Sequence, residues 1–151
     1  MGFRTFAIGR GKDKEPLARK LGAAHFVDTS AGDPAQELQK FGGARVILAT
    51  APDSKSMSAV VNGLSNNGKL VVVGASPEPI TVTPIQLIMG RKSIQGWASG
   101  TAKDSEDTMQ FSALTGVRPM IERYPLEKAA DAFQQMITGK ARFRVVLTTS
   151  V

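Results

Sequence analysis

Short apolar runs alternate along this chain with segments whose apolar residues recur at helical spacing. The runs are rich in β-branched and aromatic residues, and they predict strands at residues 3–8, 25–27, 46–49, 70–73, 93–97 and 143–147. The intervening segments predict helices at residues 14–21, 33–41, 54–64, 85–89, 105–115 and 127–137. Strands that alternate with helices are typical of βαβ units, so we expect an α/β fold around a parallel sheet.

The strand at residues 46–49 is apolar at every position, with the sequence Val46-Ile47-Leu48-Ala49. A parallel strand that helices cover on both faces has this composition, whereas a half-exposed strand alternates apolar and polar residues. We therefore predict that this strand lies in the interior of the sheet.

The chain has 151 residues, of which 42% are hydrophobic, and this size fits one compact domain. No apolar stretch approaches the roughly 18 to 20 residues of a membrane span, and no long apolar block follows the first residues as in a signal peptide. We expect a soluble, cytoplasmic protein with no membrane partner. Cysteine is absent, which excludes disulfides, thiolate nucleophiles and thiolate metal sites within this chain.

The formal net charge of +6 indicates an anionic partner. Nucleic-acid binding has only this charge in its favour, because the basic residues are scattered and only 6% of the residues are aromatic. A phosphate-bearing small ligand explains the excess equally well, so we expect no nucleic-acid partner.

Four motifs follow one another in an order that identifies a family. They are Lys20-Leu21-Gly22-Ala23 leading to Asp28, Asn67-Gly68-Lys69 through Gly74, Ser93-Ile94-Gln95-Gly96 through Gly100-Thr101, and Gly139-Lys140 through Arg144-Val145-Val146-Leu147. Together they resemble the second half of zinc-type medium-chain alcohol dehydrogenases, over essentially the whole chain. The resemblance implies a Rossmann-like, doubly wound parallel sheet with the strand order 3-2-1-4-5-6.

On that plan the chain begins at the second strand. The first strand, the glycine-rich turn that follows it and the catalytic zinc domain are missing, so residues 1–151 would form a partial dinucleotide-binding domain. The first strand is central, and its absence leaves a gap of roughly 9 to 10 Å between the strands at residues 3–8 and 46–49. Either these two strands pair directly, or another chain fills the gap, or the chain is part of a longer enzyme.

The turn after the first predicted strand contains Gly9, Arg10 and Lys14. In the resembling family an acidic residue here accepts the ribose hydroxyls of NAD, whereas a guanidinium binds the 2′-phosphate of NADP. Arg10 with Lys14 therefore favours NADP over NAD as the cofactor. A solvated basic loop is the alternative, and Asp13 could pair with either base.

The resemblance implies further cofactor contacts just after the ends of later strands. They are Thr50 and Ala51 for the adenosine, Gly74 and Ala75 for the nicotinamide ribose, Gly96 and Trp97 for the carboxamide, and Arg144 for the pyrophosphate. Each has a structural alternative: small residues favour any strand-to-loop corner, Trp97 could pack in the core or in a subunit interface, and Arg144 could be an edge-strand charge.

No residue is a persuasive catalytic candidate. His25 is the only histidine, and we expect a structural role for it. A zinc site would lie only in the absent domain. Leu87-Ile88-Met89 and the strand at residues 93–97 form an apolar stretch near the sheet edge. The resemblance implies that this edge pairs across a two-fold axis, which predicts a homo-oligomer, and ordinary core packing is the alternative.

The function implied by the resemblance is the cofactor half of an oxidoreductase. In the family, zinc polarises the oxygen of an alcohol or aldehyde while hydride passes to or from the nicotinamide. The isolated chain would be inactive because it lacks the zinc domain. The competing interpretation is a non-catalytic nucleotide-binding or interaction module. Which alcohol or aldehyde is used depends on residues outside this chain.

Overall fold

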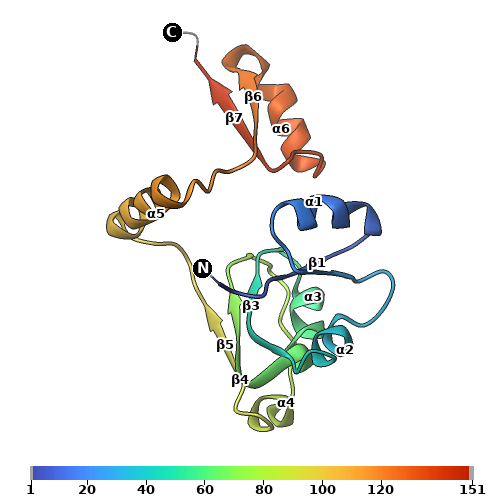
Figure 1. Ribbon diagram of the computed structural model, residues 1–151. Coiled ribbons are helices and arrows are strands. Elements are labelled where there is room, and N and C mark those ends of the chain that lie inside the picture. The colour runs from blue at the N-terminus through green and yellow to red at the C-terminus, as the bar shows by residue number, and fades with distance from the viewer. Residues whose placement is uncertain (1, 150–151) are drawn as a thin grey trace. The chain divides into compact units, whose positions relative to one another are not determined.

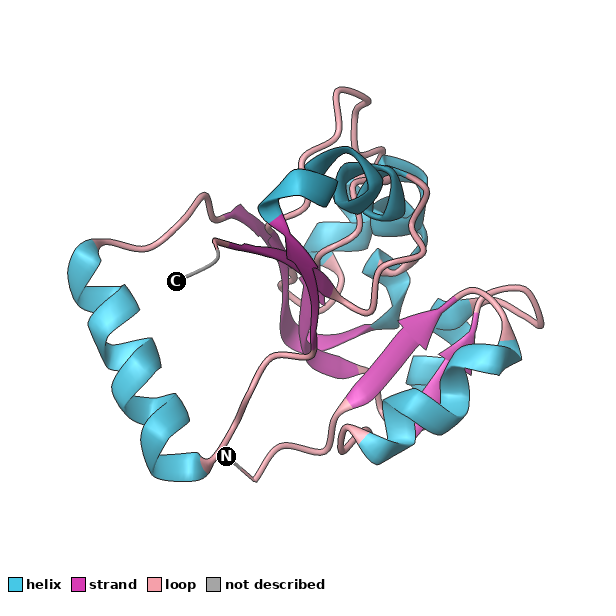
Figure 2. Cartoon of the chain, turned by 90° about the horizontal axis from the view of Figure 1, so that it is seen from above, coloured by secondary structure: helices cyan, strands magenta, loops and turns pink. Residues whose placement is uncertain are grey.

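The computed structural model describes residues 2–149, and the chain divides into two compact units, Met1–Ala98 and Ser99–Val151 (Figure 1). We call them unit 1 and unit 2. Strands alternate with helices in both units, as the sequence predicts (Figure 2).

Unit 1 contains five strands and four α-helices. In chain order they are β1 (Phe6–Gly9), α1 (Glu15–Lys20), β2 (His25–Asp28), α2 (Pro34–Gln39), β3 (Ala44–Ala49), α3 (Ser54–Ala59), β4 (Leu64–Val72), α4 (Pro84–Ile88) and β5 (Ser93–Gly96). Short 3₁₀ turns at Lys12–Lys14 and Val61–Gly63 precede α1 and β4. All the predicted strands and helices of this half of the chain are therefore present.

The strands of unit 1 form two parallel sheets. One pairs β1 with β2, and the other has the order β3-β4-β5. In the larger sheet Leu70 of β4 lies between Ile47 of β3 and Ile94 of β5. The α/β class with parallel strands is thus confirmed.

The two sheets of unit 1 are not joined. Among the described residues β1 pairs only with β2, and β3 pairs only with β4. Of the three alternatives for the gap, direct pairing of these two strands therefore does not occur. The prediction that β3 is an interior strand is wrong. It is an edge strand, and its Val46 and Leu48 side chains are 58% and 60% exposed. A complete sheet with helices on both faces would bury these two apolar side chains, but none of the described residues covers them.

The core of unit 1 lies on the other face of β3 and β4, under α2 and α3. Its buried cluster is formed by Leu38, Ile47, Met57, Val60, Val61, Leu64 and Leu70. Phe6 and Ile8 of β1 pack against this cluster, which connects the smaller sheet to the larger one through side chains rather than backbone hydrogen bonds. Apolar burial therefore holds unit 1 together across the unpaired edges.

β4 is longer than the sequence predicts. It begins at Leu64, six residues before the predicted strand at residues 70–73. The pairing of β3 with β4 shifts register between Ala44 and Val46, and Asn67 adopts a positive φ of 57°. The first part of β4 is therefore irregular.

Unit 2 contains α5 (Ala102–Thr115), β6 (Ile121–Pro125), α6 (Ala129–Ile137) and β7 (Arg144–Thr148), with a 3₁₀ turn at Leu126–Lys128 before α6. β6 and β7 pair in parallel, so β6, α6 and β7 form one βαβ unit. The sequence analysis did not predict β6, because its charged residues and terminal proline interrupt the apolar pattern of a strand.

Candidate functional site

The carboxyl ends of β1 and β3 border a cavity of about 110 Å³. Ile8 of β1 contributes to one side, and the other lining residues are Ile47, Leu48, Ala49, Thr50, Ala51, Asp53, Ser56, Met57 and Val60. Ligands of open parallel α/β sheets bind beyond the carboxyl ends of the strands. This cavity is therefore the candidate site, and it contains Thr50 and Ala51 of the sequence prediction.

The turn after β1 is held in place by Asp28 at the end of β2. One carboxylate oxygen of Asp28 accepts hydrogen bonds from the Gly11 N–H at 2.9 Å, the Ser30 N–H at 2.9 Å and the Ser30 hydroxyl at 2.6 Å. The Thr29 N–H also donates to the Gly9 carbonyl at 2.9 Å. The turn that carries Arg10 is thereby tied to the neighbouring strand.

These contacts change the acidity of Asp28. The Ser30 hydroxyl does most to hold the pKa of Asp28 below its usual value, and the backbone N–H groups of Ser30 and Gly11 lower it further. Lys14 adds a smaller effect of the same sign through its positive charge. Asp28 is therefore ionised at neutral pH beside the basic turn.

Gly9, Arg10 and Lys14 lie together at the end of β1. The Lys14 Cδ is 3.8 Å from the position that a Cβ on Gly9 would take. Arg10 is exposed, two residues beyond Ile8 of the cavity wall. None of the ion pairs between described residues involves Asp13, the residue that could have neutralised either base.

Asp53 lines the cavity and caps α3. It accepts hydrogen bonds from the N–H groups of Lys55 and Ser56 at 3.3 Å each, and from the Ser56 hydroxyl. The Ser56 hydroxyl makes the largest contribution to holding the pKa of Asp53 below its usual value, and the charge of Arg10 lowers it further. The sequence analysis missed Asp53, although an aspartate one residue before a helix is a recognisable cap signal.

Gly74 follows β4 and approaches the loop after β3 closely. Its N–H donates to the Ala49 carbonyl at 2.9 Å, and a Cβ at this position would lie 2.5 Å from the Ala51 carbonyl oxygen. Only glycine fits between these backbones without a shift. The structure thus brings Gly74 next to Thr50 and Ala51, and gives the glycine a packing role.

The other predicted contacts lie outside the cavity lining. Ala75 follows Gly74 in an exposed position, and Gly96 at the end of β5 is exposed too. The Trp97 N–H donates to the Val72 carbonyl at 2.9 Å, while its side chain is 58% exposed. The indole is therefore not part of the buried cluster of unit 1.

Arg144 lies in unit 2, where it begins β7 opposite Ile121 of β6. Its side chain is exposed. The neighbouring Arg142 donates its backbone N–H to Glu122 Oε1 at 2.7 Å. Arg144 therefore belongs to a different unit from the cavity.

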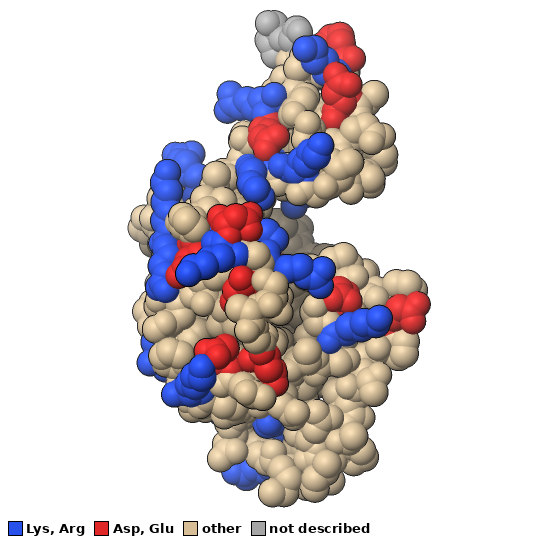
Figure 3. All heavy atoms as spheres, turned by 90° about the vertical axis from the view of Figure 1, so that its right-hand side faces the viewer, with Lys and Arg blue, Asp and Glu red and all other residues tan. Residues whose placement is uncertain are grey.

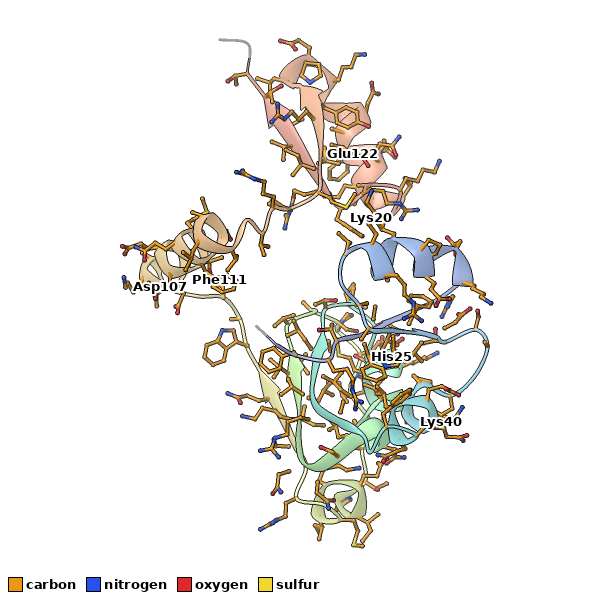
Figure 4. All side chains as sticks on the ribbon, in the orientation of Figure 1. Lys20, His25, Lys40, Asp107, Phe111 and Glu122 are labelled. Atoms are coloured by element: carbon orange, nitrogen blue, oxygen red, sulfur yellow. The ribbon has the colours of Figure 1, made fainter. Side chains whose placement is uncertain are left out.

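His25 packs against aromatic rings (Figure 4). Its ring stacks on Phe6 with 4.5 Å between centroids and lies 4.5 Å from Phe41, and the Arg4 guanidinium lies over both phenyl rings. This environment supports the structural role that the sequence predicts for His25.

The described residues do not fit zinc. No group of three or more histidine, aspartate or glutamate side chains among residues 2–149 could hold a metal ion, and the sequence has no cysteine. A zinc-dependent step would need ligands from outside this chain.

A second, larger cavity of about 440 Å³ lies at the amino ends of the strands. It is lined by Gln39, Gly42, Leu64, Ser65, Asn66, Met89 and Lys92. None of these is a predicted site residue. The smaller cavity is the better candidate for a ligand site because it lies at the carboxyl ends of the strands.

Charges of both signs are interspersed on the face shown in Figure 3. This agrees with the scattered basic residues of the sequence. None of the helices in the described part of the chain is long and apolar enough to cross a membrane.

A family model described as zinc-binding dehydrogenase matches residues 1–114. The chain is 38% identical over 148 residues to the alcohol dehydrogenase notN of Aspergillus sp. (strain MF297-2), covering 98% of this chain and 43% of that protein. It is 43% identical over 147 residues to the alcohol dehydrogenase patD of Penicillium expansum, covering 97% of this chain and 43% of that protein. The chain thus spans less than half the length of these curated relatives.

Solved structures show the same fold. An NAD-dependent alcohol dehydrogenase superposes with a TM-score of 0.86 at 22% identity, covering 97% of this chain and 44% of that chain. The benzyl alcohol dehydrogenase of Acinetobacter calcoaceticus superposes with a TM-score of 0.82 at 22% identity, covering 95% of this chain and 42% of that chain. The arrangement of strands and helices is therefore that of part of an alcohol dehydrogenase subunit.

Proposed function

Because the chain belongs to the zinc-binding dehydrogenase family, we propose that it is the nicotinamide-cofactor portion of a zinc-dependent alcohol dehydrogenase. The observation that carries this proposal is the cavity at the carboxyl ends of β1 and β3, beside a basic turn. An anionic dinucleotide is the ligand that such an edge and such a turn suit best.

The adenosine end of the cofactor would bind at this cavity. Thr50 and Ala51 offer close backbone approach there, and Arg10 with Lys14 offers positive charge for a 2′-phosphate. A planar guanidinium can bond two phosphate oxygens at once, and no carboxylate occupies position 9 to accept ribose hydroxyls instead. We therefore propose NADP as the preferred cofactor over NAD.

The remaining contacts of the proposal follow the later strands. Gly74 and Ala75 would face the nicotinamide ribose, Gly96 and Trp97 the carboxamide, and Arg144 the pyrophosphate. When bound, the nicotinamide supplies or accepts hydride. The part played by this chain is to bind and orient the cofactor.

Chemistry on an alcohol or aldehyde would require more than this chain. The described residues hold no zinc site, so the zinc that polarises the substrate oxygen in the family would be bound by other residues of the enzyme. We propose that the chain is inactive on its own and that the dehydrogenase acts in the cytoplasm.

A homo-oligomer through β5 is part of the same proposal. β5 is the edge of its sheet, and Ile88 and Met89 just before it are 68% and 65% exposed. An unpaired edge strand beside exposed apolar side chains needs cover, and pairing with a second copy of β5 would supply it.

The decisive experiment is a titration of the purified chain with NADPH and with NADH. Trp97 is the only tryptophan, so its fluorescence and its energy transfer to the reduced nicotinamide report binding directly. We expect saturable binding with NADPH preferred, and loss of that preference in Arg10→Ala. If neither cofactor binds, the chain by itself has no cofactor site, and the non-catalytic interaction module becomes the better interpretation.

A further inference from the structure

The cavity at the carboxyl ends of β1 and β3 is lined by one acidic residue and lies near the basic turn. Asp53 lines the cavity together with Ile8 of β1, and Arg10 follows Ile8 by two residues along the chain. Asp28 ties the turn to β2 by accepting from the Gly11 N–H at 2.9 Å. The backbone that carries Arg10 is therefore held near the end of β1 that borders the cavity.

Asp53 is held in a defined orientation. Its Oδ1 accepts from the Lys55 N–H, and its Oδ2 accepts from the N–H and the hydroxyl of Ser56. An ionised carboxylate offers about four acceptor sites, so these three bonds leave capacity for one more donor. The carboxylate can neither turn away from an approaching phosphate nor lose its charge easily.

Asp53 and Arg10 are close enough for their opposite charges to interact. After the Ser56 hydroxyl and the N–H groups of Ser56 and Lys55, the positive charge of Arg10 lowers the pKa of Asp53 further. The interaction acts in both directions, since a carboxylate that is stabilised by a guanidinium also stabilises that guanidinium. A 2′-phosphate that approaches Arg10 must therefore compete with Asp53.

We propose that Asp53 is a specificity-determining residue at the adenosine end of this site, where its carboxylate limits the preference of Arg10 and Lys14 for a 2′-phosphate. This inference rests on the proposed function. A phosphate carries about two negative charges and is repelled by the fixed carboxylate. A neutral ribose hydroxyl is not repelled and can donate to the free acceptor site of Asp53. The preference for NADP over NAD is consequently smaller than the basic turn alone would produce.

The test compares two nucleotides on matched variants of the full chain. Adenosine 2′,5′-bisphosphate carries the 2′-phosphate and adenosine 5′-monophosphate lacks it. Their dissociation constants are measured by isothermal titration calorimetry at low ionic strength. Asp53→Asn removes the charge but keeps a side chain that caps helices well. Asp33→Asn is the matched control, because Asp33 caps α2 by accepting from the Ala35 N–H at 2.8 Å.

We expect Asp53→Asn to raise the preference for the bisphosphate about twofold to fivefold, as for the loss of one exposed charge interaction. The gain should shrink at high salt because exposed charges are screened. Asp33→Asn should leave the preference unchanged, since it alters a cap remote from the cavity lining. Loss of folding would weaken both nucleotides together and leave their ratio unaltered, so the ratio separates specificity from stability.

The outcomes distinguish this inference from the function on which it rests. If both nucleotides bind and Asp53→Asn leaves their ratio unchanged or lowers it, the inference is wrong while the cofactor site stands. If neither nucleotide binds the unaltered chain, the proposed function fails and the inference fails with it. Arg10→Ala serves as the reference, because it should lower the ratio whenever the turn reads the 2′-phosphate.

Discussion

Units 1 and 2 use similar local patterns but bury very different amounts of apolar surface. Nine of the ten buried hydrophobic side chains among the described residues belong to unit 1, and Ala132 is the one in unit 2. α6 of unit 2 is clearly amphipathic in sequence, yet its Phe133 and Met136 are 54% and 52% exposed. An apolar stripe on a helix therefore becomes a core only where a second layer covers it.

This difference assigns distinct physical roles to the two units. Unit 1 has two parallel sheets, with α2 and α3 over one face of the larger sheet, and a buried cluster around Leu70, which suffices to position the cavity. Unit 2 has a single βαβ unit and the exposed helix α5, so its helices depend more on local interactions such as caps.

The largest effect should come from the core of unit 1. Leu70→Ala removes a side chain that is 0% exposed, and we expect it to lower the free energy of unfolding by about 2 to 5 kcal/mol. Leu114→Ala in α5 alters a side chain that is 86% exposed and should change it by less than about 0.5 kcal/mol. Urea unfolding followed by far-ultraviolet circular dichroism, which reports the helices of both units, measures the difference. Equal losses of unfolding free energy in Leu70→Ala and Leu114→Ala would contradict the proposed difference between the two units.

The close packing of Gly74 in unit 1 should give a smaller effect on stability. Gly74→Ala would place a Cβ 2.5 Å from the Ala51 carbonyl oxygen, and the resulting backbone shift should cost about 1 to 3 kcal/mol. Gly96→Ala is the matched control, because no atom lies within 4 Å of its added Cβ. Thermal unfolding of both variants decides the matter. A larger loss of stability in Gly96→Ala than in Gly74→Ala would contradict the role of Gly74 in tight packing at the carboxyl edge.

A smaller, local effect should appear in unit 2. Thr101 and Asp104 form a capping box at the start of α5, in which Asp104 Oδ2 accepts from the Thr101 N–H at 2.6 Å. Thr101→Ala should destabilise α5 by about 1 kcal/mol, and hydrogen exchange of the α5 amides measures this. Thr108→Ala, in the middle of the helix, is the control. Unchanged exchange in Thr101→Ala would mean that the cap contributes nothing to α5.

The smallest effect concerns acid stability. The pKa of Asp28 in unit 1 is lowered chiefly by the Ser30 hydroxyl, and that of Asp104 in unit 2 chiefly by the Thr101 N–H. A lowered folded-state pKa adds stability that is complete above the unfolded value, about 3.9, and is lost as the pH falls through the folded value. Melting temperatures should therefore be level from pH 7 to 5 and fall below about pH 4.

The two units can be followed separately during this acid titration, because Trp97 reports unit 1 and Tyr124, the only tyrosine, reports unit 2. Asp28→Asn should flatten the acid decline seen by the tryptophan, and Asp104→Asn the decline seen by the tyrosine. A decline that neither substitution affects would place the acid sensitivity in other carboxylates.

Much of the fold could be predicted from local patterns. The strands β1, β2, β5 and β7 and all six helices occur where apolar periodicity and caps predict them, within a few residues. β6 was missed because its pattern is broken by charge, and β3 was placed in the interior because its apolar composition suits a complete sheet. A local pattern shows whether a segment is a strand or a helix more reliably than it shows which strands lie next to it in the sheet.

The candidate site was predicted less completely. Thr50 and Ala51 line the cavity, and Gly74 lies beside them. Gly9, Arg10 and Lys14 form the adjoining turn, whereas Trp97 is exposed at the end of β5 and Arg144 belongs to unit 2. Asp53 was missed, because its place in the cavity depends on how β1 lies against β3 and α3.

The alternation of strands and helices and the helix caps could be read from the sequence alone, because they follow from interactions between residues close together in the chain. The excess of positive charge and the absence of cysteine ligands for a metal follow from composition. The tertiary structure was needed to see that β3 is an edge strand, that Gly74 approaches the Ala51 backbone and that Asp53 lines a cavity together with Ile8 of β1. Such pairings join residues far apart in sequence, and they depend on which apolar surfaces pack together.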